Sequence, residues 1–105
     1  MDKSRREMLE EFIQQKPNDS FAHYGLAMEY ANAGRHDDAL TTFQKLLSFN
    51  PDYAYAYYHA GALLGKLGRV EEARSMFQRG LEVAGRTGDL HAKSELEEAL
   101  HNLSG

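Results

Sequence analysis

Residues 20–53, SFAHYGLAMEYANAGRHDDALTTFQKLLSFNPDY, are followed directly by residues 54–87, AYAYYHAGALLGKLGRVEEARSMFQRGLEVAGRT. The second segment repeats the pattern of the first at a shift of 34 residues. Identical residues recur at several of the shared offsets, among them Tyr24 and Tyr58, Gly34 and Gly68, Arg35 and Arg69, Ala39 and Ala73, and Phe43 and Phe77. A fixed period of this length is typical of proteins in which helical repeats stack on one another. The duplication therefore predicts a repeat architecture.

The pattern of apolar residues in each copy of the repeat predicts two helices joined by a short turn. Apolar residues recur at helical spacing over residues 20–33 and 37–49 in the first copy, and over 54–67 and 70–84 in the second. Gly34 and Gly68 follow the first helix of each copy, where glycine readily adopts the left-handed conformation that ends a helix. Pro51 ends the first copy, and the segment from Gly85 to Gly88 is expected to form the corresponding turn of the second.

The flanking segments extend the same pattern. In residues 3–16, the apolar residues Met8, Leu9, Phe12 and Ile13 form one helical stripe. Pro17 precedes Pro51 by one period of 34 residues, so this helix corresponds to the second half of a leading repeat. Residues 89–103 combine a narrow apolar stripe with polar remaining faces, as a terminal capping helix does. We expect one domain over residues 1–105, made of a half repeat (3–16), two repeats (20–53 and 54–87) and a capping helix (89–103).

Composition excludes several classes of function. The 105 residues carry a net charge of −4, which gives no electrostatic basis for binding nucleic acid. The chain has no cysteine, and its histidines lack the spacing of a metal site. No apolar stretch has the length of a membrane span or the position of a secretory signal. We therefore expect a cytoplasmic, non-catalytic protein without a cofactor, with no nucleic acid or membrane among its partners.

The repeat resembles the tetratricopeptide repeat. The resemblance rests on small and aromatic residues at fixed offsets in the two copies: Ala27 and Gly61, Ala39 and Ala73, Phe43 and Phe77. The sequence departs from the family pattern at His23, Leu46 and Gly85, where the family places an aromatic residue, a small residue and a proline. The resemblance implies an all-α fold of about six helices, arranged as a right-handed superhelical stack of antiparallel helix pairs. It also implies a protein–protein interaction scaffold whose concave groove holds a peptide or protein segment.

The resemblance further implies which residues line that groove, namely those on one face of the first helix of each repeat. Carried onto this sequence, the partner-binding residues are Phe21, Tyr24, Met28, Asn32, Tyr55, Tyr58, His59 and Lys66. Spacings of three and four residues within this set support a shared helical face independently of the resemblance. Because the set is aromatic and nearly uncharged, with Lys66 and His59 as its only obvious cationic contacts, it favours a mostly apolar segment of the partner. Aromatic residues at helical spacing are also typical of a core. We assign Tyr30, Phe43, Tyr57 and Phe77 to the core, whereas both interpretations of Tyr24, Tyr55 and Tyr58 remain open at this stage.

Self-association is the alternative function. The leading half repeat lacks the helix that would cover part of Met8 and Phe12. If both side chains are exposed, they form an apolar patch through which the chain can form a homo-oligomer. The groove offers a second surface for the same purpose.

Overall fold

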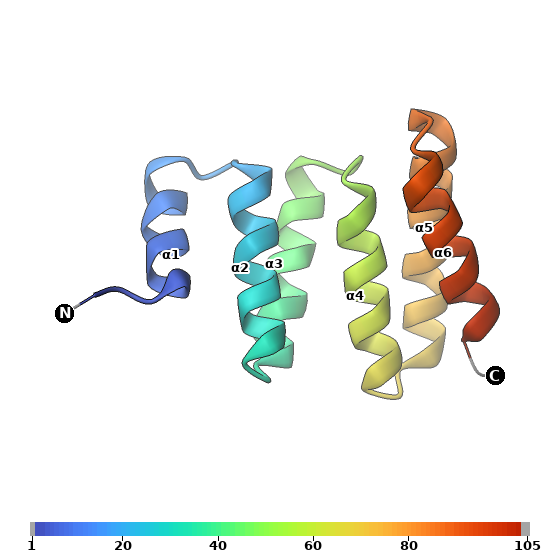
Figure 1. The fold of residues 1–105 in the computed structure, drawn as a ribbon, viewed down its shortest axis with the longest axis horizontal. Coiled ribbons are helices and arrows are strands. Elements are labelled where there is room, and N and C mark those ends of the chain that lie inside the picture. The colour runs from blue at the N-terminus through green and yellow to red at the C-terminus, as the bar shows by residue number, and fades with distance from the viewer. Residues whose placement is uncertain (1, 104–105) are drawn as a thin grey trace. The chain divides into compact units, whose positions relative to one another are not determined.

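The computed structural model describes residues 2–103, and these residues form six α-helices. They are α1 (Arg5–Gln15), α2 (Ser20–Asn32), α3 (His36–Phe49), α4 (Ala54–Lys66), α5 (Val70–Thr87) and α6 (Leu90–Asn102), as Figure 1 shows. The described residues contain no strand. The expected all-α fold is therefore confirmed, with a helix in each predicted segment.

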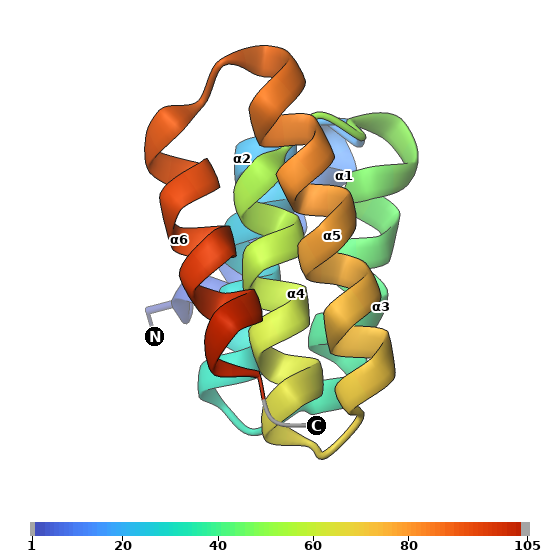
Figure 2. The same cartoon turned by 90° about the vertical axis from the view of Figure 1, so that its right-hand side faces the viewer.

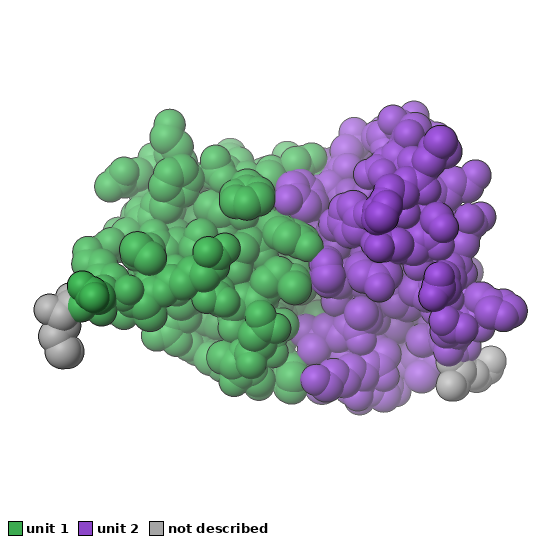
Figure 3. Space-filling model, viewed as in Figure 1, with its two compact units in different colours: residues 1–50 green, residues 51–105 purple. Residues whose placement is uncertain are grey.

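The helices group into two compact units, Met1–Asn50 and Pro51–Gly105 (Figure 3). In the first unit, α2 packs against both α1 and α3. In the second unit, α4 packs against α5 and α6, and α5 also packs against α6 (Figure 2). Paired stacking of the helices is thus confirmed within each unit. The boundary lies at the turn proline of the first repeat, and the grouping of both units into one domain stays a prediction.

Small residues and phenylalanines at repeated offsets form the core of each unit. Ala39 and Ala73 have no exposed surface, and Phe43 and Phe77 are 1% and 3% exposed. In the second unit, Gly61 lies directly against Phe77: a Cβ atom built on this glycine would be 2.5 Å from Phe77 Cε1. The small residues that repeat in the sequence therefore allow paired helices to approach closely.

The predicted helix ends have clear causes in local chemistry. Asp19 caps α2 by accepting a hydrogen bond from the Ala22 N–H at 2.8 Å, and Asp89 caps α6 in the same way. Gly34 and Gly68 have φ angles of 78° and 80°, in the left-handed region that favours glycine. The turns within both repeats are thus formed as the sequence predicts.

One departure from the family pattern preserves a contact. In the second repeat, the Tyr57 hydroxyl donates a hydrogen bond of 2.8 Å to the Pro51 carbonyl. At the same offset in the first repeat, His23 Nε2 donates a hydrogen bond of 2.7 Å to the Pro17 carbonyl. His23 is 2% exposed and its ring meets that of Phe49 edge-on at 5.0 Å. The His23 imidazole therefore links α2 to the turn before it, and the Tyr57 phenol links α4 to the turn before it in the same way.

The predicted end of the fifth helix is wrong. We expect a turn over the segment from Gly85 to Gly88, but α5 continues to Thr87 and ends at Gly88, whose φ is 76°. A single glycine inside a helix costs only about 1 kcal/mol, whereas proline at this offset would break the helix. The additional turn is held by Arg86, which donates a 2.7 Å hydrogen bond to Asp52, and by Thr87, which donates to the Val83 carbonyl.

Candidate functional site

Four of the predicted binding residues lie on α2, in the first unit. Phe21 is 71% exposed, which is high for a phenylalanine, and Asn32 is also exposed. Tyr24 and Met28 are half-buried. The Tyr24 ring packs edge-on against the buried Phe43 ring, with 6.5 Å between the centroids. Tyr24 thus has one side in contact with the core and keeps part of its surface accessible.

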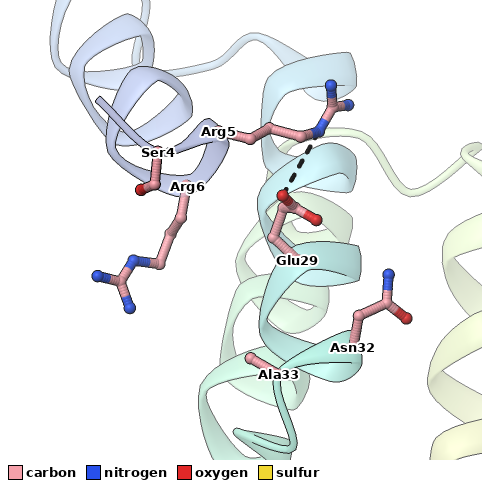
Figure 4. A pocket seen from close by; sticks show the side chains of 6 residues that line it. All are labelled: Ser4, Arg5, Arg6, Glu29, Asn32 and Ala33. Carbon is pink, nitrogen blue, oxygen red and sulfur yellow. Dashed lines mark ion pairs between the residues drawn. The ribbon is translucent and has the colours of Figure 1, made fainter. Parts of the chain in front are cut away.

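Asn32 lies in a pocket that the first helix helps to form. The pocket has a volume of about 420 Å³ and is lined by Ser4, Arg5 and Arg6 together with Glu29, Asn32 and Ala33 (Figure 4). Arg5 Nε is 3.7 Å from a carboxylate oxygen of Glu29. The predicted set contained no residue of α1, so the repeat offsets did not indicate that Arg5 and Arg6 line the same pocket as Asn32.

The other four predicted residues lie on α4, in the second unit. Tyr55, Tyr58 and His59 are half-buried and close together, whereas Lys66 is exposed on the last turn of the helix. The Tyr55 and Tyr58 rings are 6.2 Å apart and nearly perpendicular, and the His59 ring is 5.0 Å from that of Tyr58. Tyr58 also packs against the buried Phe77 at 6.3 Å. The structure therefore brings three of these four side chains together.

Helix α6 completes this group with residues that were not predicted. The His91 ring is 6.2 Å from the Tyr55 ring, and His91 Nε2 is 3.2 Å from Glu95 Oε1. We call Tyr55, Tyr58, His59 and His91 the ring cluster. The sequence does indicate where these two residues lie on α6. His91 and Glu95 directly precede Ala92 and Leu96, which are the buried residues of this helix. His91 and Glu95 therefore lie on its flank.

The charge of the ring cluster differs from the first expectation. We expect His59 to offer a cationic contact, yet burial lowers the pKa of His59, and the carboxylate of Glu95 opposes this effect only in part. The imidazole of His59 is therefore neutral at pH 7. Lys66 lies seven residues further along α4, about 10 Å away at 1.5 Å per residue. The Glu95 carboxylate thus lies beside His91 and acts electrostatically on His59.

The aromatic residues assigned to the core divide in two. Tyr57 is 3% exposed and is as buried as Phe43 and Phe77. Tyr30 is half-buried instead: its hydroxyl donates a 3.0 Å hydrogen bond to Glu10, and the guanidinium carbon of Arg35 lies 4.7 Å from its ring centroid. Tyr30 therefore packs at the edge of the first unit, between α1 and the turn that follows α2.

Three further findings concern function. Among residues 2–103, no group of three or more histidine, aspartate or glutamate side chains has the geometry to hold a metal ion. Within the same described part of the chain, no helix has both the length and the apolar character that crossing a membrane requires. Neither of the two family models that match the chain describes an enzyme.

Those family models identify the repeats directly. One, described as TPR repeat, matches residues 27–68, and the other, described as tetratricopeptide repeat, matches residues 54–87. The second model begins and ends at the bounds of the second repeat predicted from the sequence. The solution structure of a tetratricopeptide repeat domain protein from Salinibacter ruber has a TM-score of 0.79 and 36% sequence identity, and the similarity covers 85% of this chain and 90% of that one.

Curated proteins show similarity over different shares of their length. An uncharacterised protein of Methanocaldococcus jannaschii is 41% identical over 61 residues, which are 58% of this chain and 71% of that protein. A tetratricopeptide repeat and J domain-containing co-chaperone of Cryptococcus neoformans is 33% identical over 94 residues. These residues are 90% of this chain but 17% of the co-chaperone.

Proposed function

Because the chain belongs to the tetratricopeptide repeat family, whose domains are generally protein-interaction modules, we propose that it is a non-catalytic scaffold for a peptide or protein segment. The proposed contacts are the aromatic-rich faces of α2 and α4. They comprise Phe21, Tyr24, Met28 and Asn32 in the first unit, and Tyr55, Tyr58, His59 and Lys66 in the second.

One observation carries this proposal: several aromatic side chains remain accessible although the core beneath them is filled. Tyr24 packs against the buried Phe43, and Tyr58 packs against the buried Phe77. These core contacts hold each tyrosine ring in position while the rest of its surface stays accessible. Tyrosine offers a large contact area with a polar tip and loses few rotamers on binding, which is why it is frequent at the centre of interfaces. The exposed side chain of Phe21 adds apolar area on α2, the helix that also carries Tyr24.

Replacing both tyrosines tests the proposed face. We expect the double variant Tyr24→Ala/Tyr58→Ala to lose partners that the native chain captures from a lysate of its source cells. Each tyrosine also contacts a core phenylalanine, so we expect the free energy of unfolding to fall by about 1–2 kcal/mol per site, less than for a fully buried aromatic residue. Circular dichroism and denaturant titration measure the stability, and quantitative mass spectrometry of the captured proteins measures binding.

Tyr30→Ala is the matched control, because Tyr30 is also a half-buried tyrosine of α2. Its side chain contacts Glu10 and Arg35, and it does not belong to the proposed binding face. This variant is expected to keep its partners, with a loss of stability similar to that at each single site of the double variant. Equal loss of partners in both variants would contradict the proposal, because reduced stability alone would then explain it. Retention of every partner by the double variant would also contradict it.

Self-association is a second candidate, favoured by the exposure of α1. Met8 and Phe12 are 54% and 42% exposed, and their spacing of four residues places them on the same side of the helix. If this patch joins two chains, sedimentation velocity at micromolar concentration will show a dimer, and Met8→Ser/Phe12→Ser will return the chain to a monomer. A native chain that sediments as a monomer throughout this range would rule the candidate out.

A further inference from the structure

We propose that α1 is a strap that opens from α2 as one piece while the rest of the first unit stays folded, and that its release widens the proposed binding face of α2. The second part of this inference rests on the proposed function, because it concerns the surface beside Met28 and Asn32. The first part is a property of the chain itself and can be tested without a partner.

Helix α1 contributes no side chain to the core of the first unit. The structure describes every residue of α1 and none of them is buried, whereas each of the other five helices has at least two buried residues. The apolar residues Leu9 and Ile13 are half-buried, and Met8 and Phe12 are exposed. Segments with few buried apolar contacts open at a lower free energy than the core does. We therefore expect α1 to open first.

Polar contacts connect α1 to α2. The Tyr30 hydroxyl donates a 3.0 Å hydrogen bond to Glu10, and Arg5 Nε lies 3.7 Å from a carboxylate oxygen of Glu29 (Figure 4). The Arg5 side chain is 63% exposed, and exposed ion pairs contribute little to stability. A hydrogen bond to a charged acceptor contributes more, and burial raises the pKa of Tyr30, so that its hydroxyl stays protonated. We call the hydrogen bond between Tyr30 and Glu10 the latch.

The turn between α1 and α2 is anchored on the side of α2. His23, which is 2% exposed, donates a 2.7 Å hydrogen bond to the Pro17 carbonyl, and Asp19 caps α2. Helix α1 ends at Gln15, so Lys16 is the residue between the helix and the anchored proline. When α1 leaves α2, we therefore expect the backbone to change direction at Lys16.

An undocked α1 is too short to stay helical. Isolated helices shorter than about 12–15 residues are marginal in water, and α1 has 11 residues. The capping box, in which Ser4 accepts a 3.1 Å hydrogen bond from the Glu7 N–H, stabilises the first turn but does not replace the contacts with α2. Release therefore exposes the amides of α1 to exchange with solvent, and the opening becomes measurable.

The stripe of α2 that faces α1 runs from Gly25 to Ala33. A Cβ atom on Gly25 would lie 3.5 Å from both methyl carbons of Leu9. Glu29 pairs with Arg5, and Ala33 lines the same pocket as Arg5. Successive members of this stripe are four residues apart and therefore share one side of the helix. Release of α1 uncovers the whole stripe.

Uncovering this stripe widens the proposed binding face. Met28 lies three residues after Gly25, and Asn32 lies three residues after Glu29, so both are direct neighbours of the stripe. Asn32 also lines a pocket together with the first residues of α1. A partner segment that contacts Met28 and Asn32 therefore reaches more of α2 when the strap is open.

Hydrogen exchange of the full native chain, followed residue by residue by NMR, tests the opening. Because opening of the strap costs less than unfolding of the first unit, we expect the central amides of α1 to be protected at least about 100-fold less than the slowest amides of α3. Helix α6 is the internal control, since it is the last helix of the structure as α1 is the first, but it buries Ala92 and Leu96. Its central amides should be protected more strongly than those of α1.

Two variants and a matched control separate the strap from the rest of the first unit. Tyr30→Phe removes the latch hydroxyl and keeps the ring, so the amides of α1 should exchange about tenfold faster. Phe43→Leu loosens the core between α2 and α3, and it should accelerate the slowest amides of α3 by about tenfold or more while leaving those of α1 unchanged. Tyr57→Phe is the control, because it removes a hydroxyl that bonds to Pro51 in the second unit, and it should leave the exchange of α1 unchanged.

A thiol placed beneath α1 tests what the strap covers. The native chain has no cysteine, and a Cβ atom on Gly25 fits at 3.5 Å from Leu9, so Gly25→Cys introduces a single thiol under the strap. We expect a thiol reagent to label it at least about tenfold more slowly than a thiol in an unstructured peptide. Adding Tyr30→Phe should raise the labelling rate by about tenfold, because labelling requires the same opening. Circular dichroism confirms that each variant is folded.

The proposal is overturned if the amides of α1 are protected as strongly as those of α3 or α6, or if Phe43→Leu accelerates α1 together with α3. It is also overturned if Tyr30→Phe affects α1 no more than Tyr57→Phe does, or if the thiol of Gly25→Cys reacts as fast as an unstructured one. These measurements use no partner, so their failure leaves the scaffold function standing. If the strap opens as expected but Tyr24→Ala/Tyr58→Ala keeps its partners, the scaffold function fails on its own test and the opening of α1 remains.

Discussion

Phe43→Ala is expected to lower the free energy of unfolding by about 3–5 kcal/mol, the range for removing a buried aromatic side chain. Phe43 is 1% exposed and is among the largest fully buried side chains, so truncation leaves a cavity that its neighbours on α2 and α3 fill only in part. Total stabilities of domains are about 5–15 kcal/mol, so this loss is a large share of the whole. Denaturant unfolding followed by circular dichroism measures it.

Phe21→Ala is the control for this prediction. It removes the same side chain from a position that is 71% exposed, and we expect a change within about 0.5 kcal/mol. A cost below about 1 kcal/mol for Phe43→Ala, or equal costs for the two variants, would show that Phe43 is not part of the core of the first unit.

Gly61→Leu is expected to destabilise the second unit by about 3 kcal/mol or more, the upper end of the range for overpacking. Even a Cβ atom at this position would come 2.5 Å from Phe77 Cε1, and leucine adds three more carbon atoms. Phe77 is 3% exposed and cannot swing into solvent without leaving the core. Replacing glycine in a helix gains up to about 1 kcal/mol, so the clash outweighs the gain in helix propensity.

Gly85→Leu isolates the gain in helix propensity from the steric clash, because it introduces the same side chain where there is space for it. Gly85 lies in α5, and within the described residues a Cβ atom there would meet nothing within 4 Å apart from its chain neighbours and the nearby backbone of its own helix. This variant is therefore expected to be neutral or stabilised by up to about 1 kcal/mol. Combining Gly61→Leu with Phe77→Ala should cost at least about 1 kcal/mol less than the sum of the single changes, because the smaller residue makes room for the leucine. Additive costs would mean that the two positions do not share a contact.

The sequence is informative about the fold because its repeated residues act locally or in the contact between paired helices. Gly34 and Gly68 end helices through their own backbone conformation, and Ala39 and Ala73 are small where helices touch. Such causes are visible in a pattern of period 34. The end of α5 was missed because it depends on the pair between Arg86 and Asp52, residues 34 positions apart, and not on the turn chemistry of Gly85 alone.

The candidate site was less accessible to sequence reasoning. Offsets within a repeat placed Tyr55, Tyr58 and His59 on one side of α4, and the structure brings these residues together. They gave no information about α6, because the longer α5 shifts the register: Tyr55 meets His91, 36 positions later instead of 34. The neutral state of His59 was also hidden, since it follows from burial that only the packed structure reveals.

The hydrogen bonds of His23 and Tyr57 to the preceding prolines have a consequence for how the two copies diverge. Side chains of different length and chemistry reach the carbonyl of the proline six residues earlier, which lies in the turn before each repeat. This position therefore requires a side chain that can donate a hydrogen bond to the carbonyl of the turn proline. Whether the ring is a phenol or an imidazole is less important. Two copies of a repeat can therefore differ in sequence at a position where both retain the same hydrogen bond. The shared interaction then remains recognisable after the residue identities have diverged.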